Sequence, residues 1–179
     1  MYKDNSLIPS EAVRLAALGL LAMRSRAYAD LARDIRHFTA RIVGPSLDLL
    51  GPSLELLKIE GLIEAVDPKL TNDAQTVRLT KDGETELQRL MNAHLRGPMG
   101  EVNKLIVALK LYFLDLLTPE QRRQQLEMLM EVCDRELIRL NDLRDHHVDT
   151  DSALLPWLDH EIEEVQRRRD WFLKVWEGR

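Results

Sequence analysis

Arginines are concentrated in one short segment of the sequence, and their chemistry is that of binding phosphate groups. Between residues 24 and 41 there are five arginines but only two carboxylates, Asp30 and Asp34. A guanidinium group donates paired hydrogen bonds to phosphate oxygens, and a tyrosine hydroxyl adds another donor. We therefore interpret this segment as a surface for a nucleic-acid backbone, carried by Arg24, Arg26, Tyr28, Arg36 and Arg41.

Each of these arginines has an alternative role in a solvated helix face with local ion pairs. Asp30 and Arg33 are three residues apart, the spacing at which side chains of opposite charge meet on a helix. An arginine held in such a pair would serve the fold rather than a phosphate. The sequence leaves both roles open.

The next segment, residues 46–79, has the opposite balance of charge. Its cations are Lys58, Lys69 and Arg78, and carboxylates outnumber them. Acidic side chains oppose the approach of phosphates. Two hypotheses follow: the segment reads DNA weakly, or the protein is an interaction module that has lost DNA recognition. Under the first hypothesis, the contacts to DNA come from Ser46, Ser53, Lys58, Lys69 and Arg78.

A short internal repeat lies at the start of this segment. The motif Gly-Pro-Ser-Leu, an acidic residue and Leu-Leu occupies residues 44–50 and again residues 51–57. Serine is a preferred helix N-cap, and proline beyond the first turn kinks a helix. We expect a helix from Ser46 to Glu60, kinked at Pro52, with Gly61 in the left-handed conformation after its end.

The flanking elements complete a small domain. Amphipathic spacing predicts helices over residues 12–23 and 28–38. Alternating apolar residues predict strands over 62–66 and 75–79, and Thr80 is suited to cap a fourth helix. Three short helices followed by a two-stranded wing predict a winged helix-turn-helix domain over residues 1–95.

The second half of the chain differs in composition. Residues 96–100, Arg-Gly-Pro-Met-Gly, predict a hinge, and an apolar helix is expected over 102–117. Thr118 and Gln121 form a capping box around Pro119, which marks the start of a long helix. A last long helix is expected after Ser152. The predicted fold class is mostly α with a small β-wing, and residues 101–179 form a helical dimerisation domain.

The two long helices carry narrow apolar stripes with charged flanks, as in a coiled coil. Such stripes need a partner surface, and a second copy of the chain, in a closed dimer, is the interpretation we prefer. The alternative is an intramolecular pair of helices packed on the first domain. The residues expected at the dimer interface are Leu109, Leu126, Leu129, Cys133, Leu137, Leu158, Ile162, Val165, Phe172 and Trp176.

The sequence resembles the PadR family of transcriptional regulators over most of its length. In the first half, residues 18–21 (Leu-Gly-Leu-Leu), 26–28 (Arg-Ala-Tyr), 52–54, 60–63 and 78–83 resemble the family's helices and wing. In the second half, residues 113–122 (Phe-Leu-Asp-Leu-Leu-Thr-Pro-Glu-Gln-Arg) and 155–158 (Leu-Pro-Trp-Leu) resemble the helical region of its larger, virulence-activator-like members.

This resemblance implies a homodimer that binds an inverted repeat of double-stranded DNA. It also implies a repressor and, in some members, a small aromatic effector that relieves repression. The chain departs from the family at Gly51, where a tyrosine is usual, and in a wing that offers Lys69 alone near its tip.

Aromatic side chains of the second half are candidates for a pocket that would hold such an effector. They are Trp157, Trp171 and Trp176, with Tyr112 and Phe113. Their helical spacing fits ordinary packing in a core or dimer interface better. The neighbouring His146 and His147 lack the spacing of a metal site, so a solvated helix end is the simpler interpretation.

The remaining observations exclude whole classes of protein. No apolar run is long enough to cross a membrane, and the first residues lack the pattern of a secretory signal. Cys133 is the single cysteine, which excludes an internal disulfide and suits a reducing compartment. We expect a cytoplasmic protein. No phosphate-cradling glycine loop or Gly-x-Ser-x-Gly motif is present, so we expect no cofactor, no metal and no enzymatic activity.

Overall fold

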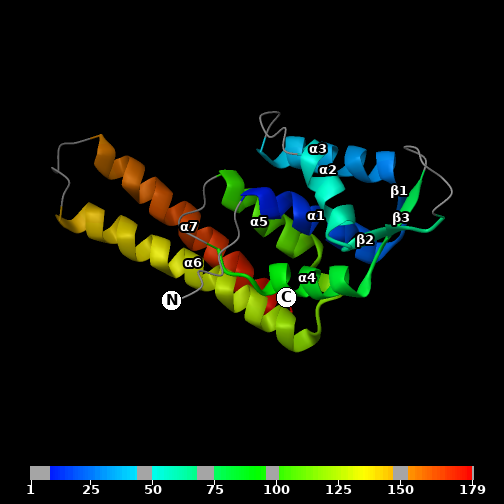
Figure 1. The fold of residues 1–179 in the computed structure, drawn as a ribbon. Coiled ribbons are helices and arrows are strands. Elements are labelled where there is room, and N and C mark those ends of the chain that lie inside the picture. The colour runs from blue at the N-terminus through cyan, green and yellow to red at the C-terminus, as the bar shows by residue number, and fades with distance from the viewer. Residues whose placement is uncertain (1–8, 44–49, 68–74, 96–100, 147–152, 179) are drawn as a thin grey trace, which may run out of the picture. The chain divides into compact units, whose positions relative to one another are not determined.

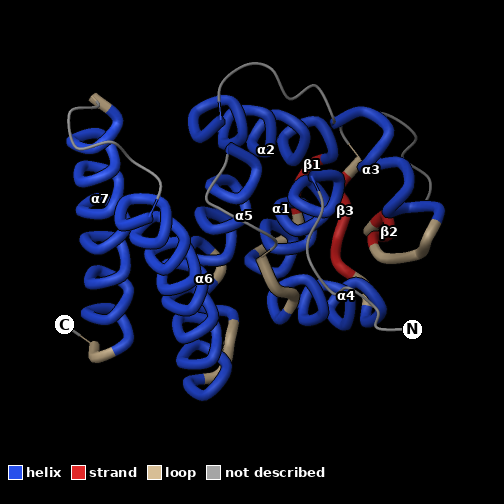
Figure 2. The backbone as a smooth tube through the Cα atoms, turned by 90° about the vertical axis from the view of Figure 1, so that its left-hand side faces the viewer, coloured by secondary structure: helices blue, strands red, loops and turns tan. Residues whose placement is uncertain are grey.

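The computed structural model describes residues 9–43, 50–67, 75–95, 101–146 and 153–178. It consists of two compact units, residues 1–116 and 117–179, each described here by itself. The fold is mostly helical with one small antiparallel sheet (Figures 1 and 2). The predicted fold class is therefore confirmed. None of the helices in the described ranges is both long and apolar enough to cross a membrane.

Unit 1 is built around its first helix, α1 (Pro9–Met23). Its other helices are α2 (Tyr28–Val43), α3 (Leu50–Ile59), α4 (Lys81–Asn92) and α5 (Glu101–Tyr112), followed by the 3₁₀ turn η1 (Leu114–Leu116). The helix α1 contacts all four of these α-helices and one strand. Leu15, Ala17 and Leu18 of α1 are fully buried, so apolar residues on several of its sides form the core of the unit.

The wing consists of three short strands, β1 (Arg26–Ala27), β2 (Ile63–Ala65) and β3 (Thr76–Leu79). The strand β3 lies in the middle and pairs with both neighbours in antiparallel register, with Arg26 opposite Val77 and Glu64 opposite Arg78. The two predicted strands are present with slightly shorter bounds. The strand β1 was not predicted, because two residues carry no pattern of alternation.

The turn from α3 into the wing follows the predicted chemistry. Gly61 has a φ of 72°, the left-handed conformation that glycine adopts without steric cost after a helix. Thr80 caps α4 as predicted, since its Oγ1 accepts a hydrogen bond from the Gly83 N–H at 3.1 Å. The expected start of α3 at Ser46 falls among residues 44–49, which lie outside the described residues.

Unit 2 is a hairpin of two long antiparallel helices, α6 (Pro119–His146) and α7 (Leu154–Trp176), which pack along one another (Figure 1). The capping box predicted before α6 is present: Gln121 N–H donates to Thr118 Oγ1 at 3.3 Å, and Thr118 N–H donates to Gln121 Oε1 at 3.0 Å. Ion pairs join the two helices, among them Arg144 with Asp159.

The helix α5 lies in unit 1, where it packs on α1 and α2. From the sequence, residues 101–116 were expected in the second domain. Composition separates α5 from the helices before it, but its apolar faces are buried against α1 and α2, and Leu105, Ile106 and Leu109 have almost no exposed surface.

Candidate nucleic-acid interface

Three of the arginines expected to contact phosphate are exposed and carry no ion pair to another described residue. Arg24 directly follows α1, and Arg36 and Arg41 lie on α2. The helices α2 and α3 are the two helices of the helix-turn-helix. An exposed guanidinium that is not already paired keeps its donors for a ligand. These three side chains are the part of the predicted surface that the structure leaves available.

Arg26 is used inside the fold instead. Its side chain is only 10% exposed. It donates from Nη1 to Asp34 Oδ2 at 2.6 Å and from Nε to the Leu20 carbonyl at 3.3 Å. It therefore ties β1 to α2 and α1. The alternative role that the sequence left open, an internal ion pair, is the one that Arg26 has.

Tyr28 and Lys58 join α2 to α3. The Tyr28 hydroxyl donates to Glu55 Oε1 at 2.7 Å, and Lys58 Nζ lies 4.2 Å from the centre of the Tyr28 ring and 3.7 Å from Glu55 Oε1. Lys58 also donates to Gln75 Oε1 at 3.5 Å. These contacts hold the helix-turn-helix together, so both side chains would have to exchange partners before reaching a phosphate.

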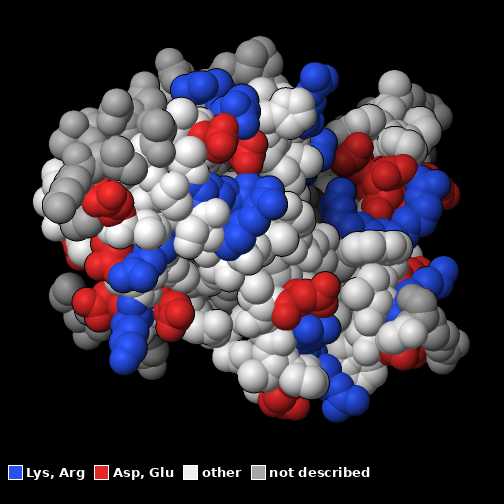
Figure 3. Space-filling view, turned by 90° about the vertical axis from the view of Figure 1, so that its right-hand side faces the viewer, with Lys and Arg blue, Asp and Glu red and all other residues white. Residues whose placement is uncertain are grey.

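The wing offers little free positive charge among its described residues. Arg78 is paired with Glu64 at 2.7 Å across the two strands. Ser46 and Lys69, together with the side chain of Ser53, lie outside the described residues. Basic and acidic side chains are intermixed over the face shown in Figure 3, rather than separated into one basic surface.

The described part of α3 exposes aliphatic and acidic groups. Leu56 is 49% exposed and Ile59 is 79% exposed, and Glu55 is exposed between the two helices. Direct reading of base edges requires hydrogen-bonding side chains. In the second half of α3, Leu56 and Ile59 offer no hydrogen-bonding group, and Glu55 and Lys58 are engaged with Tyr28 and with one another.

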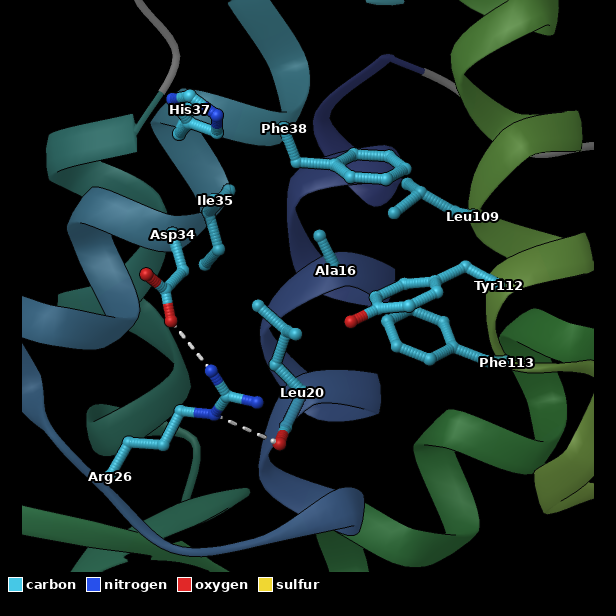
Figure 4. A pocket seen from close by; sticks show the side chains of 10 residues that line it. All are labelled: Ala16, Leu20, Arg26, Asp34, Ile35, His37, Phe38, Leu109, Tyr112 and Phe113. Atoms are coloured by element: carbon cyan, nitrogen blue, oxygen red, sulfur yellow. Dashed lines mark hydrogen bonds and ion pairs between the residues drawn. The ribbon is translucent and has the colours of Figure 1, made fainter. Parts of the chain in front are cut away.

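A pocket lies between α1, α2 and α5 (Figure 4). Its volume is about 210 Å³, and its walls include Leu20, Phe38, Tyr112 and Phe113. The rings of Phe38 and Tyr112 are stacked with centroids 5.6 Å apart, and the Arg26–Asp34 pair closes one side. Tyr112 and Phe113 were among the predicted pocket residues, whereas Trp157, Trp171 and Trp176 lie in unit 2 and do not line this pocket.

Lys110 was not among the residues predicted to have a role, yet it is a charged side chain in the core of unit 1. It is fully buried, and burial lowers the pKa of its ammonium to about 7. Its Nζ donates to the carbonyls of Met91 at 2.5 Å and Ala93 at 2.8 Å. A lysine within an otherwise apolar helix was the available signal, since a buried charge must have partners.

Most residues expected at a dimer interface are buried within the single chain. In the α6–α7 hairpin, Leu137, Ile162 and Trp176 are half-buried, and Leu109 is buried in unit 1. The fully buried members are Leu126, Leu129, Cys133, Leu158, Val165 and Phe172.

Cys133 lies in this apolar stripe as predicted, and burial raises the pKa of its thiol to about 11. The reactive thiolate is therefore suppressed at neutral pH. Among the described residues, no three His, Cys, Asp or Glu side chains lie close enough to hold a metal ion. His147 lies outside the described residues.

Comparison with known protein families identifies one that matches nearly the whole chain. The family model described as "Putative AphA-like transcriptional regulator" matches residues 2–175 of the chain. No curated protein matches.

Solved structures of Bacillus subtilis PadR match this chain over most of its length, at low sequence identity and low TM-score. One has a TM-score of 0.40 and 18% sequence identity, covering 96% of this chain and 96% of that chain. The same protein in complex with p-coumaric acid has a TM-score of 0.38 and 19% identity, covering 96% and 97%. Its complex with operator DNA has a TM-score of 0.36 and 18% identity, covering 92% and 97%. Operator DNA and p-coumaric acid are ligands of that Bacillus protein.

Proposed function

Because this chain belongs to the AphA-like family of transcriptional regulators, we propose that it binds double-stranded DNA as a homodimer and represses transcription from an inverted-repeat operator. The observation that carries DNA binding is a group of three exposed arginines, Arg24, Arg36 and Arg41, on and beside the helix-turn-helix, which form no ion pair with another described residue. Neutralising phosphate charge supplies most of the affinity of such a surface. Contacts to bases would then come from the segment before the described part of α3.

The experiment that tests this proposal compares variants of the arginine surface. Fluorescence anisotropy with a labelled duplex, titrated between about 50 mM and about 200 mM salt, gives the slope of affinity against salt. Replacing both Arg36 and Arg41 by Ala should weaken binding and reduce that slope by about 2, because each lost phosphate contact removes nearly one counterion. Arg139→Ala, an exposed arginine of α6, is the matched control. An unchanged slope in the double variant would remove this surface from the proposal.

Dimerisation is proposed through the outer face of the α6–α7 hairpin. The inner stripe is already buried, but Ile138, Trp157 and Trp171 remain 69%, 51% and 49% exposed. Trp157 and Trp171 are separated by about four turns and so lie on one face of α7. Exposed tryptophans grouped on one helix face are typical of an interface rather than of a solvated surface.

We further propose that the pocket between α1, α2 and α5 holds a small aromatic effector. Its volume of about 210 Å³ suits a molecule of one ring, and its aromatic walls with a few polar groups are typical of a ligand site. Calorimetric titration with single-ring phenolic acids, p-coumaric acid among them, tests this proposal. Ala16→Leu adds volume at the pocket wall and should abolish binding, whereas a variant that binds equally well would place the ligand elsewhere.

A second candidate function is a protein-interaction module with a winged-helix fold that has lost DNA recognition. The exposed Leu56 and Ile59 beside Glu55 on α3 favour it. The two functions differ in one measurement: a folded protein that binds no duplex at low salt, and binds a protein partner through α3, would support the second.

A further inference from the structure

The side chain of Lys110, which belongs to α5, donates hydrogen bonds to backbone carbonyls at the C-terminal end of α4. Lys110 lies on α5, and its Nζ reaches the carbonyls of Leu90, Met91 and Ala93 at 3.4, 2.5 and 2.8 Å. The last carbonyls of a helix have no partners within the helix and carry the negative end of its dipole. The Ala93 N–H already donates to the Leu90 carbonyl at 3.3 Å, and the lysine adds donors for that carbonyl and for those of Met91 and Ala93.

Among the described residues, three backbone carbonyls lie within reach of the Lys110 ammonium. An ammonium group has three N–H donors and no acceptor, and three carbonyls surround it. The dipoles of these carbonyls thus stabilise the buried ammonium of Lys110.

The other end of α4 is fastened to the turn after α3. The Thr80 hydroxyl donates to the Gly61 carbonyl at 2.7 Å and accepts from the Gly83 N–H at 3.1 Å. Gly83 leaves no room for a side chain, because a Cβ there would overlap the Leu62 carbonyl. As a result α4 is held to α5 at one end and to the end of α3 at the other.

The same helix that carries Lys110 also forms a wall of the pocket. Leu109 and Tyr112 of α5, and Phe113 after it, line the pocket on either side of Lys110 in the sequence (Figure 4). A shift of α5 that accommodates a ligand must therefore move Lys110, because Lys110 and the pocket residues Leu109 and Tyr112 belong to the same helix.

We propose that Lys110 is a positioning residue that transmits occupancy of the pocket to the helix-turn-helix, by pulling on α4 and through Thr80 on the turn after α3. This proposal rests on the proposed effector pocket but not on DNA binding. The proposed path runs through Lys110. A competing path would bypass Lys110 and use the direct contacts of α5 with α1 and α2.

The test is a double-variant cycle read by hydrogen–deuterium exchange on the full chain. Ala16→Leu fills the pocket without a ligand, and Lys110→Met removes the donors while keeping an unbranched side chain. Lys110→Met alone should raise the exchange of the α4 C-terminal amides about tenfold or more, because buried carbonyls lose their partner. Lys104→Met, at an exposed lysine of the same helix, should have no effect.

The coupling itself is read at residues 60–65 and 76–83. Filling the pocket should change exchange there when Lys110 is present and leave it unchanged in the Lys110→Met background. An equal effect of Ala16→Leu in both backgrounds, or none in either, would overturn the proposal. Because DNA takes no part in this measurement, failure of the proposed DNA binding would be seen separately in the anisotropy titration.

A second measurement covers the case in which Lys110→Met does not fold. In protein labelled with ¹⁵N-lysine, the buried ammonium of Lys110 should give a slowly exchanging signal, assigned by its absence from Lys110→Arg. Ala16→Leu should shift that signal while leaving the signal of Lys104 in place. A Lys110 signal that is insensitive to filling of the pocket would contradict the proposed path.

Discussion

At the scale of single residues, Gly19 sets how closely α1 approaches the end of α5. The ring of Phe113 lies directly against the Gly19 backbone, so a Cβ at this position would overlap three ring atoms. Phe113 is itself fully buried and lines the pocket. Glycine is therefore needed here for space rather than for its backbone freedom.

Gly19→Ala should lower the free energy of unfolding by about 1–3 kcal/mol, the usual cost of overpacking a core. Urea unfolding followed by circular dichroism measures this change. In a Phe113→Leu background the same substitution should cost much less, because the ring that it meets is gone. An equal cost in both backgrounds would show that the ring does not limit the approach of the helix.

The lowered pKa of Lys110 predicts that the stability of the fold depends on pH. Its pKa falls from an ordinary value of 10.5 to about 7 on folding, so between these values the unfolded chain binds more protons than the folded chain. The free energy of unfolding should then rise with pH above about 7, and this contribution is lost as the pH falls through about 7. Urea midpoints of the wild type and Lys110→Met at about pH 7 and about pH 8.5 measure it.

The expected result is a rise for the wild type and for Lys104→Met that is absent from Lys110→Met. Titration of other groups is common to the three proteins and cancels in the comparison. Parallel pH profiles of the wild type and Lys110→Met would show that Lys110 keeps its ordinary pKa in the fold.

The sequence shows where the arginines are, but it does not predict which of them form internal ion pairs. Arg26 and Arg36 are two arginines of one basic segment, yet Arg26 is bonded to Asp34 and Leu20 while Arg36 is exposed. The difference arises because β1 lies close enough to α1 and α2 for Arg26 to reach Leu20 and Asp34. No local sequence pattern predicts this tertiary contact. Lys110 was missed for the same reason, since its partners are 17 to 20 residues away.

At the scale of elements, α4 connects the wing to the rest of unit 1. Its first turn is capped by Thr80, whose hydroxyl also bonds the Gly61 carbonyl. Its exposed side carries the Arg89–Glu86 ion pair, and Leu87, Leu90 and Met91 bury its other side. The Thr80 side chain therefore both caps α4 and links this helix to the turn after α3.

Thr80→Ala should destabilise the protein by about 1 kcal/mol, the usual value for loss of a threonine N-cap. Thr80→Ser keeps the hydroxyl and should restore most of the loss. Thr85→Ala, at an exposed threonine of the same helix whose hydroxyl bonds only its own helix backbone, is the control. Chemical unfolding gives the values, and equal stability of Thr80→Ala and wild type would refute the role of the cap.

Elements with strong local signals were predicted well. Thr80 before α4, Thr118 and Gln121 before α6, and Gly61 after α3 each have the chemistry of a helix end, and the structure confirms all three. The domain to which α5 belongs was not predictable in this way. Its many apolar residues indicate burial on several sides but do not say against which helices.

At the scale of the whole molecule, the apolar stripes of α6 and α7 were predicted, whereas their partner was left open. The stripe that contains Leu129, Cys133 and Phe172 is buried within the chain. Self-association, if it uses this hairpin, must therefore use the outer residues that remain exposed. The proposed dimer depends on Ile138, Trp157 and Trp171 rather than on the inner stripe.

Replacing Trp157 and Trp171 together by Glu should convert the proposed dimer into a monomer, because two carboxylates would be desolvated at the interface. Size-exclusion chromatography with light scattering measures the mass directly. Leu56→Glu introduces one carboxylate at a similarly exposed apolar residue of unit 1 and should leave the mass unchanged. A wild-type protein that is monomeric throughout would contradict the dimer.

Two observations support DNA binding as the function of the molecule. The chain belongs to a family of transcriptional regulators, and three exposed arginines on and beside the helix-turn-helix form no ion pair within the described part of the chain. The most direct test is an anisotropy titration of the full chain against DNA from its own upstream region, at about 50 mM and about 200 mM salt, with an unrelated duplex as competitor. We expect tight, salt-dependent binding that the unrelated duplex fails to displace. A folded protein that binds neither duplex at either salt would contradict DNA binding and leave the interaction module as the function of this fold.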